Sequence, residues 1–218
     1  MRKQFDNELN KLNKDLIEMG HLVETAIENM IDSFKHQDKA LAKEIIANDR
    51  IINDKERSIE SRAFRLILTQ QPIATDLRNV TAALKIVTDL ERIGDQAADI
   101  ADILLHFDGE HLYRTVEHIP KIAKKAKIMV HAAIDAFIQK DLATAKIVIE
   151  MDDEIDRLFQ EVKQEVVEIL QEKREKVDYR IDFLMIAKYL EKIGDHTVNI
   201  CEWLEFNRTG TLNEQRLI

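Results

Sequence analysis

The sequence has 218 residues, of which 45% are hydrophobic, and a formal net charge of −9 at neutral pH. This length and apolar content can bury a sizeable core, which excludes disorder as the default state. The acidic balance argues against nucleic acid as a partner, because binding to a phosphate backbone depends on clustered lysine and arginine.

The cellular compartment is indicated by three absences in the sequence. The single cysteine, Cys201, cannot form an intramolecular disulfide, and the first residues lack the apolar run of a signal peptide. No stretch approaches the ~18 apolar residues that a membrane-spanning helix needs. We therefore expect a cytoplasmic protein that reaches the membrane only through partner proteins.

Long helices are predicted along the whole chain. Two prolines and five glycines are too few to separate many short strands, so the fold class is all-α. Apolar residues at three- and four-residue spacing predict six helices, with bounds approximate to a few residues, at about 3–35, 39–69, 73–107, 114–139, 141–173 and 178–206. They form two sets of three, and we expect two tandem three-helix bundles, at 1–109 and 110–218.

Aspartates precede the second helix of each set. Asp38 and Asp141 stand where a short carboxylate accepts hydrogen bonds from the unpaired N–H groups of a helix start. Each follows a phenylalanine, Phe34 or Phe137, by four residues. This correspondence indicates that the two sets are copies of one unit.

The connection before the third helix contains Pro72, which presets a helix start. Asp76 then falls in the first turn, where the helix dipole favours a carboxylate without any further role. Arg78 has no such local explanation.

A six-residue motif identifies the repeat most clearly. The segment 90–95, LERIGD, recurs at 190–195 as LEKIGD. A glycine inside a helix costs about 1 kcal/mol relative to alanine, so its presence in both copies calls for a physical reason. Gly94 and Gly194 lie between the acidic and apolar faces of their helices, where a missing side chain lets another helix approach closely.

Acidic residues share one face of the third helix, and the sixth helix repeats the arrangement. On a helical wheel Glu91, Asp95 and Asp99 lie together and point away from the apolar stripe. Further polar pairs, Asp49 with Asn53 and Asp152 with Asp156, occupy matched positions in the second and fifth helices. Oxygen ligands from two adjacent helices suit hard cations such as Mg²⁺, Mn²⁺ or iron better than a soft-ligand zinc site.

Solvated helix faces are the alternative interpretation of these acids. In a chain with 41 acidic residues, a single Glu-x-x-x-Asp pair carries almost no information. His196, beside Asp195, would add an imidazole ligand, but the first copy has Gln96 at that position. Glu18 and His21 have the Glu-x-x-His spacing of di-iron enzymes, but Lys121 and Lys124 at the matched positions argue against a di-iron core.

The two motif copies, their spacing, and Pro72 followed by Asp76-Leu77-Arg78 resemble the PhoU family of bacterial phosphate-transport accessory and phosphate-signalling proteins. The resemblance implies two three-helix bundles related by internal pseudo-two-fold symmetry, commonly homodimeric, with metal bound on the outside of each bundle. The metal implied is a divalent or trivalent ion: iron, Mg²⁺, Mn²⁺ or Zn²⁺. Carried over by position, the metal site residues are Asp49, Asn53, Glu91, Asp95 and Asp99 in the first bundle, and Asp152, Asp156, Glu191, Asp195 and Asn199 in the second.

Asn53 and Asn199 replace an acid of the other copy, so each site is expected to be one charge short. In the family the segment around Asp76 and Arg78 is a signature, which makes both residues candidates for partner binding.

The function implied is that of a non-enzymatic negative regulator of the phosphate-starvation response. It would couple the ATPase of the phosphate ABC transporter to a sensor histidine kinase. Two alternatives stay open: a helical iron metalloenzyme or metal store that uses the same carboxylates, and a spectrin-like spacer. The spacer gives no reason for paired glycines beside acids.

Overall fold

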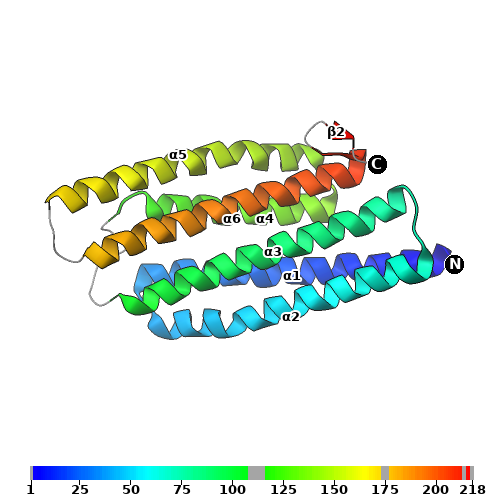
Figure 1. Cartoon of the computed structure of the whole chain (residues 1–218), viewed down its shortest axis with the longest axis horizontal. Coiled ribbons are helices and arrows are strands. Elements are labelled where there is room, and N and C mark those ends of the chain that lie inside the picture. The colour runs from blue at the N-terminus through cyan, green and yellow to red at the C-terminus, as the bar shows by residue number, and fades with distance from the viewer. Residues whose placement is uncertain (1, 108–115, 173–176, 213–214, 217–218) are drawn as a thin grey trace.

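Six long helices make up almost all of the described structure, a computed structural model that describes residues 2–107, 116–172, 177–212 and 215–216 (Figure 1). The helices are α1 (Arg2–His36), α2 (Lys39–Gln70), α3 (Thr75–His106), α4 (Ile119–Gln139), α5 (Leu142–Glu172) and α6 (Val177–Thr209). A two-residue antiparallel hairpin, β1 (Thr211–Leu212) with β2 (Gln215–Arg216), follows α6. The predicted all-α class is confirmed.

The helices form because their apolar residues recur every three or four positions and therefore share one side. The stripe of α1 is fully buried and consists of Leu12, Leu16, Met19, Val23, Ile27, Met30 and Phe34. Equivalent stripes on the other helices pack against it in a continuous core. Cys201 belongs to this core, as predicted, and burial raises the pKa of its thiol to about 12.

The two short turns α1–α2 and α4–α5 have the same local design. Gln37 and Lys140 both adopt a left-handed φ, of 52° and 57°, which reverses the chain. The next residues, Asp38 and Asp141, accept hydrogen bonds from backbone N–H groups of the following helix, at 2.9 Å from Ala40 and 2.9 Å from Ala143. The predicted caps are confirmed.

Two helices begin a few residues later than the approximate predicted starts, and the local backbone explains both. α3 begins at Thr75 rather than at residue 73, because Ala74 has a φ of 49° that no right-handed helix accepts. α4 begins at Ile119 rather than at residue 114, with Pro120 in its first turn. Residues 116–118 form a bend and turn, and residues 114 and 115 lie outside the described part of the chain. Proline is well tolerated only in the first turn, so its position determines the start.

The two bundles, α1–α3 and α4–α6, meet mainly where α3 lies against α6, with a second contact of α1 with α4. Figure 1 shows α3 and α6 running in opposite directions along the middle of the molecule. Asp89 of α3 is buried in this contact, where Oδ1 accepts a hydrogen bond from Nδ2 of Asn199 at 3.0 Å and lies 2.9 Å from Nδ1 of His196. A polar clamp therefore joins the bundles inside an apolar contact.

The predicted boundary between the halves, 109 to 110, lies outside the described residues and stays a prediction. Within the described part of the chain, none of the helices is both long enough and apolar enough to cross a membrane.

Candidate functional site: two acidic clusters and the α2–α3 end

The first acidic cluster lies where α2 packs against α3. Glu91 and Asp95 of α3 face Asp49, Asn53 and Glu56 of α2, close enough to perturb one another electrostatically. The side chain of Glu91 is only 15% exposed, so the acidic face is partly covered by α2 and is not simply a solvated surface. Nδ2 of Asn53 donates a hydrogen bond to Oδ2 of Asp49 at 2.9 Å.

Burial and neighbouring negative charges raise the pKa values of carboxyls in the first cluster. Desolvation, followed by repulsion from Asp95 and Glu56, raises the pKa of Glu91 to about 7. Desolvation and the charges of Asp95 and Asp99 also raise the pKa of Asp49. Nε of Arg92 is 3.5 Å from Oε2 of Glu91, which reduces this repulsion without cancelling it.

The second acidic cluster has the same construction between α5 and α6. Desolvation, then Asp195, Asp156 and Glu191, raises the pKa of Asp152 to about 6. Desolvation and the charges of Glu191 and Asp195 raise the pKa of Asp156. Two lysines compensate part of this charge: Lys188 contacts both carboxylate oxygens of Glu191, at 2.7 and 2.6 Å, and Lys192 pairs with Asp195.

The paired glycines bring the helices of each cluster together. A Cβ atom at Gly94 would lie 2.9 Å from Cδ1 of Ile52, and one at Gly194 would lie 2.6 Å from Oδ1 of Asp152. Both distances are shorter than a normal contact. The predicted reason for the glycines, close approach of a neighbouring helix beside the acids, is confirmed.

Unpartnered oxygens in both clusters fit the donor chemistry of a hard cation. Among the described residues, Oδ1 of Asp49, Oδ1 of Asn53 and Oδ1 of Asp152 are buried and accept no hydrogen bond. Oε2 of Glu91 is also buried without a hydrogen bond, although Nε of Arg92 lies 3.5 Å away as an ion-pair partner. Buried polar atoms usually have a partner, so these oxygens have free capacity to bind an ion. No three His, Cys, Asp or Glu side chains of the described chain are yet grouped so that they could hold one. The donors therefore fit, although they are not drawn together around one point.

Two of the predicted metal residues lie at the edge of this arrangement. Nδ2 of Asn199 donates a hydrogen bond to Oδ1 of Asp89, across the contact between the bundles. Asp99 is exposed as a residue, but partial desolvation of its carboxyl, followed by the charges of Asp95 and Asp102, raises the pKa of that carboxyl. His196 also faces Asp89. The metal roles of Asn199 and Asp99 stay predictions.

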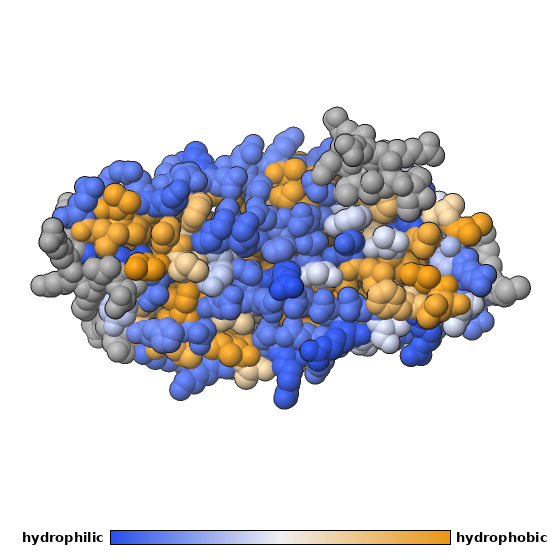
Figure 2. Space-filling model, in the orientation of Figure 1, coloured by the Kyte–Doolittle hydropathy of each residue, from blue (hydrophilic) through white to orange (hydrophobic). Residues whose placement is uncertain are grey.

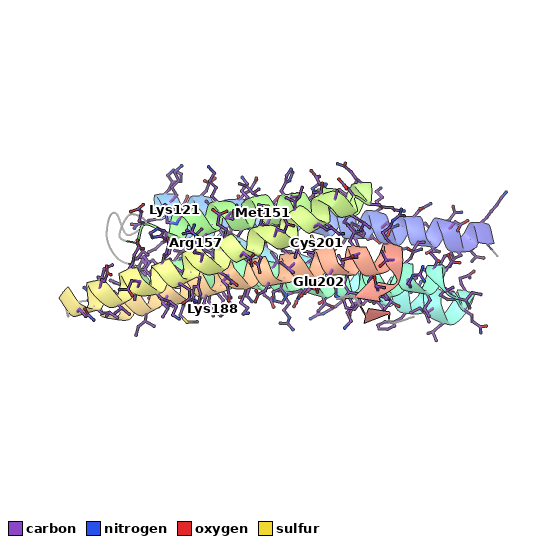
Figure 3. The ribbon with its side chains drawn as sticks, turned by 90° about the horizontal axis from the view of Figure 1, so that it is seen from above. Lys121, Met151, Arg157, Lys188, Cys201 and Glu202 are labelled. Carbon is purple, nitrogen blue, oxygen red and sulfur yellow. The ribbon has the colours of Figure 1, made fainter. Side chains whose placement is uncertain are left out.

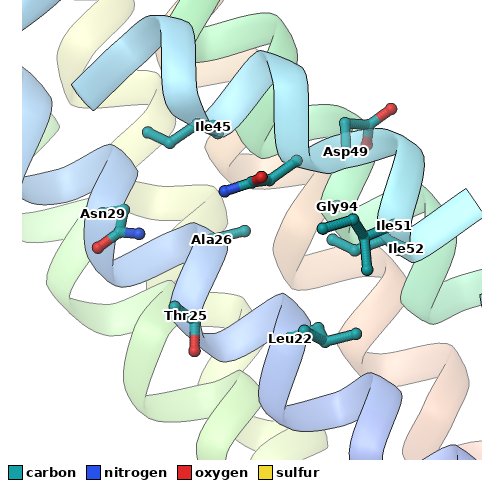
Figure 4. Close-up of a pocket in the computed structure, with 10 residues that line it drawn as sticks. Leu22, Thr25, Ala26, Asn29, Ile45, Asp49, Ile51, Ile52 and Gly94 are labelled. Atoms are coloured by element: carbon teal, nitrogen blue, oxygen red, sulfur yellow. The ribbon is translucent and has the colours of Figure 1, made fainter. Parts of the chain in front are cut away.

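An apolar pocket of about 90 Å³ lies beside the first cluster, between α1 and α2. Figure 4 shows Leu22, Thr25 and Asn29 of α1 on one side, and Ile45 and Ile52 of α2 on the other. Gly94 of α3 and Asp49 of α2 also line the pocket. The missing side chain of Gly94 thus shapes both the acidic cluster and this pocket.

The end of the molecule where α2 meets α3 carries Asp76 and Arg78. Asp76 lies in the first turn of α3, as predicted. Arg78 donates a hydrogen bond from Nη2 to Oγ1 of Thr75 at 3.1 Å, whereas its buried Nε has no partner among the described residues. Sequence reasoning had assigned Arg78 no local contact, and the bond to Thr75 supplies one.

Exposed apolar side chains beside this end were missed from the sequence. Phe64, Leu68 and Ile73 are 54%, 78% and 78% exposed. Figure 2 shows apolar residues toward both ends of the visible face and hydrophilic residues over its middle. The signal was available, because Phe64 and Leu68 are four residues apart and lie off the buried stripe of α2.

Comparisons with known sequences agree with this description. The model of the PhoU domain matches residues 16–104 and 119–204, one match for each bundle. A "phosphate-specific transport system accessory protein PhoU homolog" of Clostridium acetobutylicum is 40% identical over 210 residues, 96% of each chain. A homolog of the same name from Borreliella burgdorferi is 33% identical over 96% of this chain and 97% of its own.

Solved structures match over the same length. PhoU from Pseudomonas aeruginosa aligns with a TM-score of 0.88 and 31% identity, over 95% of this chain and 100% of its own. The phosphate transport system regulatory protein PhoU from Streptococcus pneumoniae aligns with a TM-score of 0.89 and 29% identity, over 95% and 98%. With the repeated motif, the doubled bundle and the full-length similarity in agreement, the chain belongs to the PhoU family.

Proposed function

We propose that this protein is a cytoplasmic, non-enzymatic regulator of phosphate uptake that represses the phosphate-starvation response when phosphate is plentiful. It acts as a homodimeric adaptor between the ATPase of the phosphate ABC transporter and a sensor histidine kinase. The observation that carries the proposal is full-length similarity to proteins named as phosphate-specific transport accessory proteins. The exposed Phe64, Leu68 and Ile73 beside Arg78 supply a surface for one partner.

A deletion strain and a binding assay test this role. Deletion of the gene is expected to raise starvation-induced phosphatase activity in rich phosphate. Arg78→Ala and Phe64→Ser are each expected to reproduce part of this rise. In the binding assay, both variants are expected to retain less of the purified ATPase or kinase. Lys43→Ala, an exposed change elsewhere on α2, is the matched control. Low phosphatase activity in a deletion strain that has no second copy of the gene would exclude the regulatory role. Light scattering of the purified protein tests whether it is a dimer.

A hard cation is the second part of the proposal. Asp49, Glu91 and Asp95 would hold it in the first cluster, and Asp152, Asp156, Glu191 and Asp195 in the second. Bound there, it would supply the positive charge that the clustered carboxylates lack and draw α2 toward α3 and α5 toward α6. Because each cluster takes side chains from two helices, a bound ion would connect those two helices.

Elemental analysis of untagged protein tests the cation. Glu91→Ala and Glu191→Ala are each expected to lower the bound metal, while Glu150→Ala, an exposed acid on α5, leaves it unchanged. Metal-dependent turnover or oxidase activity would instead favour the metalloenzyme alternative. Metal-free protein that still binds the transporter ATPase would exclude a requirement for metal in that contact.

A further inference from the structure

A basic groove lies on the outer side of the second bundle, between α4 and α5. It is an open cleft of about 450 Å³, and within the described chain its basic lining residues are His118, Lys121, Lys124, Lys125 and Arg157, against Glu154 and Glu161. Figure 3 shows Lys121 on α4 and Arg157 on the neighbouring α5, near one another at the same end of the bundle. Such a concentration of positive charge stands out in a chain whose net charge is −9.

The internal repeat provides a comparison within the same molecule. Glu18, His21 and Asp54 of the first bundle occupy the positions of Lys121, Lys124 and Arg157. In the first bundle Lys55 closes the space between α1 and α2, with Nζ at 2.8 Å from Oδ1 of Asp15 and 2.7 Å from Oε2 of Glu18. The matched position in the second bundle is Leu158. The charge of the groove is therefore a property of one copy and not of the three-helix unit.

Three positive side chains of the groove, Lys124, Lys121 and Arg157, are available to a ligand, whereas Lys125 pairs with Glu154 and His118 contacts Glu161 and Glu165. Lys124 is exposed and makes no ion pair among the described residues. Lys121 is paired with Glu117 at 2.6 Å, but the two side chains are 47% and 73% exposed. Arg157, also exposed, pairs with Glu161 one turn along α5. Exposed pairs of this kind contribute about 0–1 kcal/mol, so an incoming carboxylate can replace the internal one at little cost.

An apolar side chain lies among the charges. Ile128 lines the groove and is 46% exposed, whereas the matched residue of the first bundle is Thr25. Lys121, Lys124, Lys125 and Ile128 recur every three or four residues and so form one stripe along α4. From His118 to Ile128 the stripe extends for about 15 Å, roughly three helical turns.

We propose that the α4–α5 groove binds an acidic amphipathic helix of a partner protein. Carboxylates at the spacing of one helical turn face Lys121, Lys124 and Arg157, and an apolar residue between them contacts Ile128. Charge complementarity and an open cleft between two adjacent helices favour a helix over a flat anionic membrane surface. The inference is independent of the proposed regulatory role, since it requires only the groove.

A direct binding measurement tests the groove. The probe is a labelled synthetic peptide of about 20 residues with a leucine stripe flanked by glutamates, because shorter helices are marginal in water. A peptide with glutamine in place of glutamate is its control. Fluorescence anisotropy with the intact protein is expected to show saturable binding of the acidic peptide that weakens with added salt, and no binding of the glutamine peptide.

Variants locate the binding site. Lys124→Glu breaks no internal pair and is expected to weaken binding about fivefold, and the double variant Lys121→Gln with Lys124→Gln by a similar factor. Ile128→Thr installs the residue of the first bundle and is expected to weaken binding about threefold. Lys146→Glu, an exposed change on α5 outside the groove, leaves binding unchanged. Thermal unfolding verifies that each variant is folded.

Several outcomes would overturn the proposal. Equal weakening by Lys146→Glu and Lys124→Glu would mean attraction to general charge and not to the groove. Absence of peptide binding at low salt would exclude the site. Inorganic phosphate, or vesicles with anionic lipid, bound in a Lys124-dependent manner while the peptide is not, would assign the groove to an anion or to a membrane surface instead.

Discussion

Oδ1 of Asp152 occupies the space that a side chain at position 194 would need, since a Cβ atom on Gly194 would lie 2.6 Å from it. The glycine and the acid therefore depend on each other: the glycine lets α5 approach α6, and that approach half-buries the carboxylate. In the first bundle the same position, Gly94, faces Ile52. A Cβ atom on Gly194 would also lie 3.2 Å from Cδ1 of Ile155, the repeat-matched residue of Ile52, so the repeat preserves the isoleucine contact and the second bundle adds the carboxylate of Asp152.

Gly194→Ala tests this approach. Alanine gains about 1 kcal/mol of helix propensity, but overpacking a tight contact costs about 1–3 kcal/mol. We expect the free energy of unfolding, measured by urea denaturation, to fall by about 1 kcal/mol, the balance of these two effects. Gly94→Ala should behave similarly, because Ile52 is buried and has little room to move. Stabilisation of both variants by the full propensity gain would show that the helices are not in tight contact.

Glu91→Gln tests the pH dependence of stability in metal-free protein. The pKa of Glu91 is raised from 4.5 to about 7, so the folded protein holds this proton more tightly than the unfolded chain does. The stabilising contribution of this proton is therefore fully present below about pH 4.5 and is lost as the pH rises through about 7. The glutamine variant avoids this loss.

We expect the advantage of Glu91→Gln over the natural protein, in urea unfolding, to grow by about 1 kcal/mol between about pH 5 and about pH 8, after allowance for solvent screening. Glu150→Gln, at an exposed site, serves as the control. An advantage that is the same at both pH values would contradict the raised pKa.

Asn53→Asp tests the inequality of the two clusters. It gives the first cluster the acid that Asp156 supplies in the second. We expect its affinity for Mn²⁺, measured by calorimetry, to increase about tenfold, because each added ligand charge strengthens a hard-cation site. Without a cation the variant should unfold more easily, since one more carboxylate repels Asp49. Unchanged Mn²⁺ binding would place the ion elsewhere.

Asp89→Ala tests the clamp between the bundles. The change removes the acceptor of Asn199 and the partner of His196 in the contact between α3 and α6. Buried groups that lose a hydrogen-bond partner cost about 1–3 kcal/mol, so denaturation should detect a loss in that range. Asp102→Ala, an exposed change on the same helix, should be nearly neutral. Equal effects of the two variants would show that the clamp contributes nothing.

Much of the fold could be predicted because its causes are local. The stripe from Leu12 to Phe34 follows from hydrophobic periodicity, and Asp38 and Asp141 cap their helices through N–H groups two and three residues away. The small differences at the helix starts have local causes as well. The start of α3 was predicted two residues early, because the φ of 49° at Ala74 cannot be inferred from an alanine in the sequence.

The candidate site divides in the same way. The helical fold, the duplication and the residues of the acidic motif could be predicted from the sequence alone. The spacing of apolar residues and the repeated motif are both visible in the order of the residues. The packing of the helices places α2 over Glu91, brings Asn199 within hydrogen-bond distance of Asp89, and brings Lys121 and Arg157 to one groove. These relationships depend on how separate helices pack, and packing is decided by side-chain complementarity over the whole core and not by the spacing within any one helix.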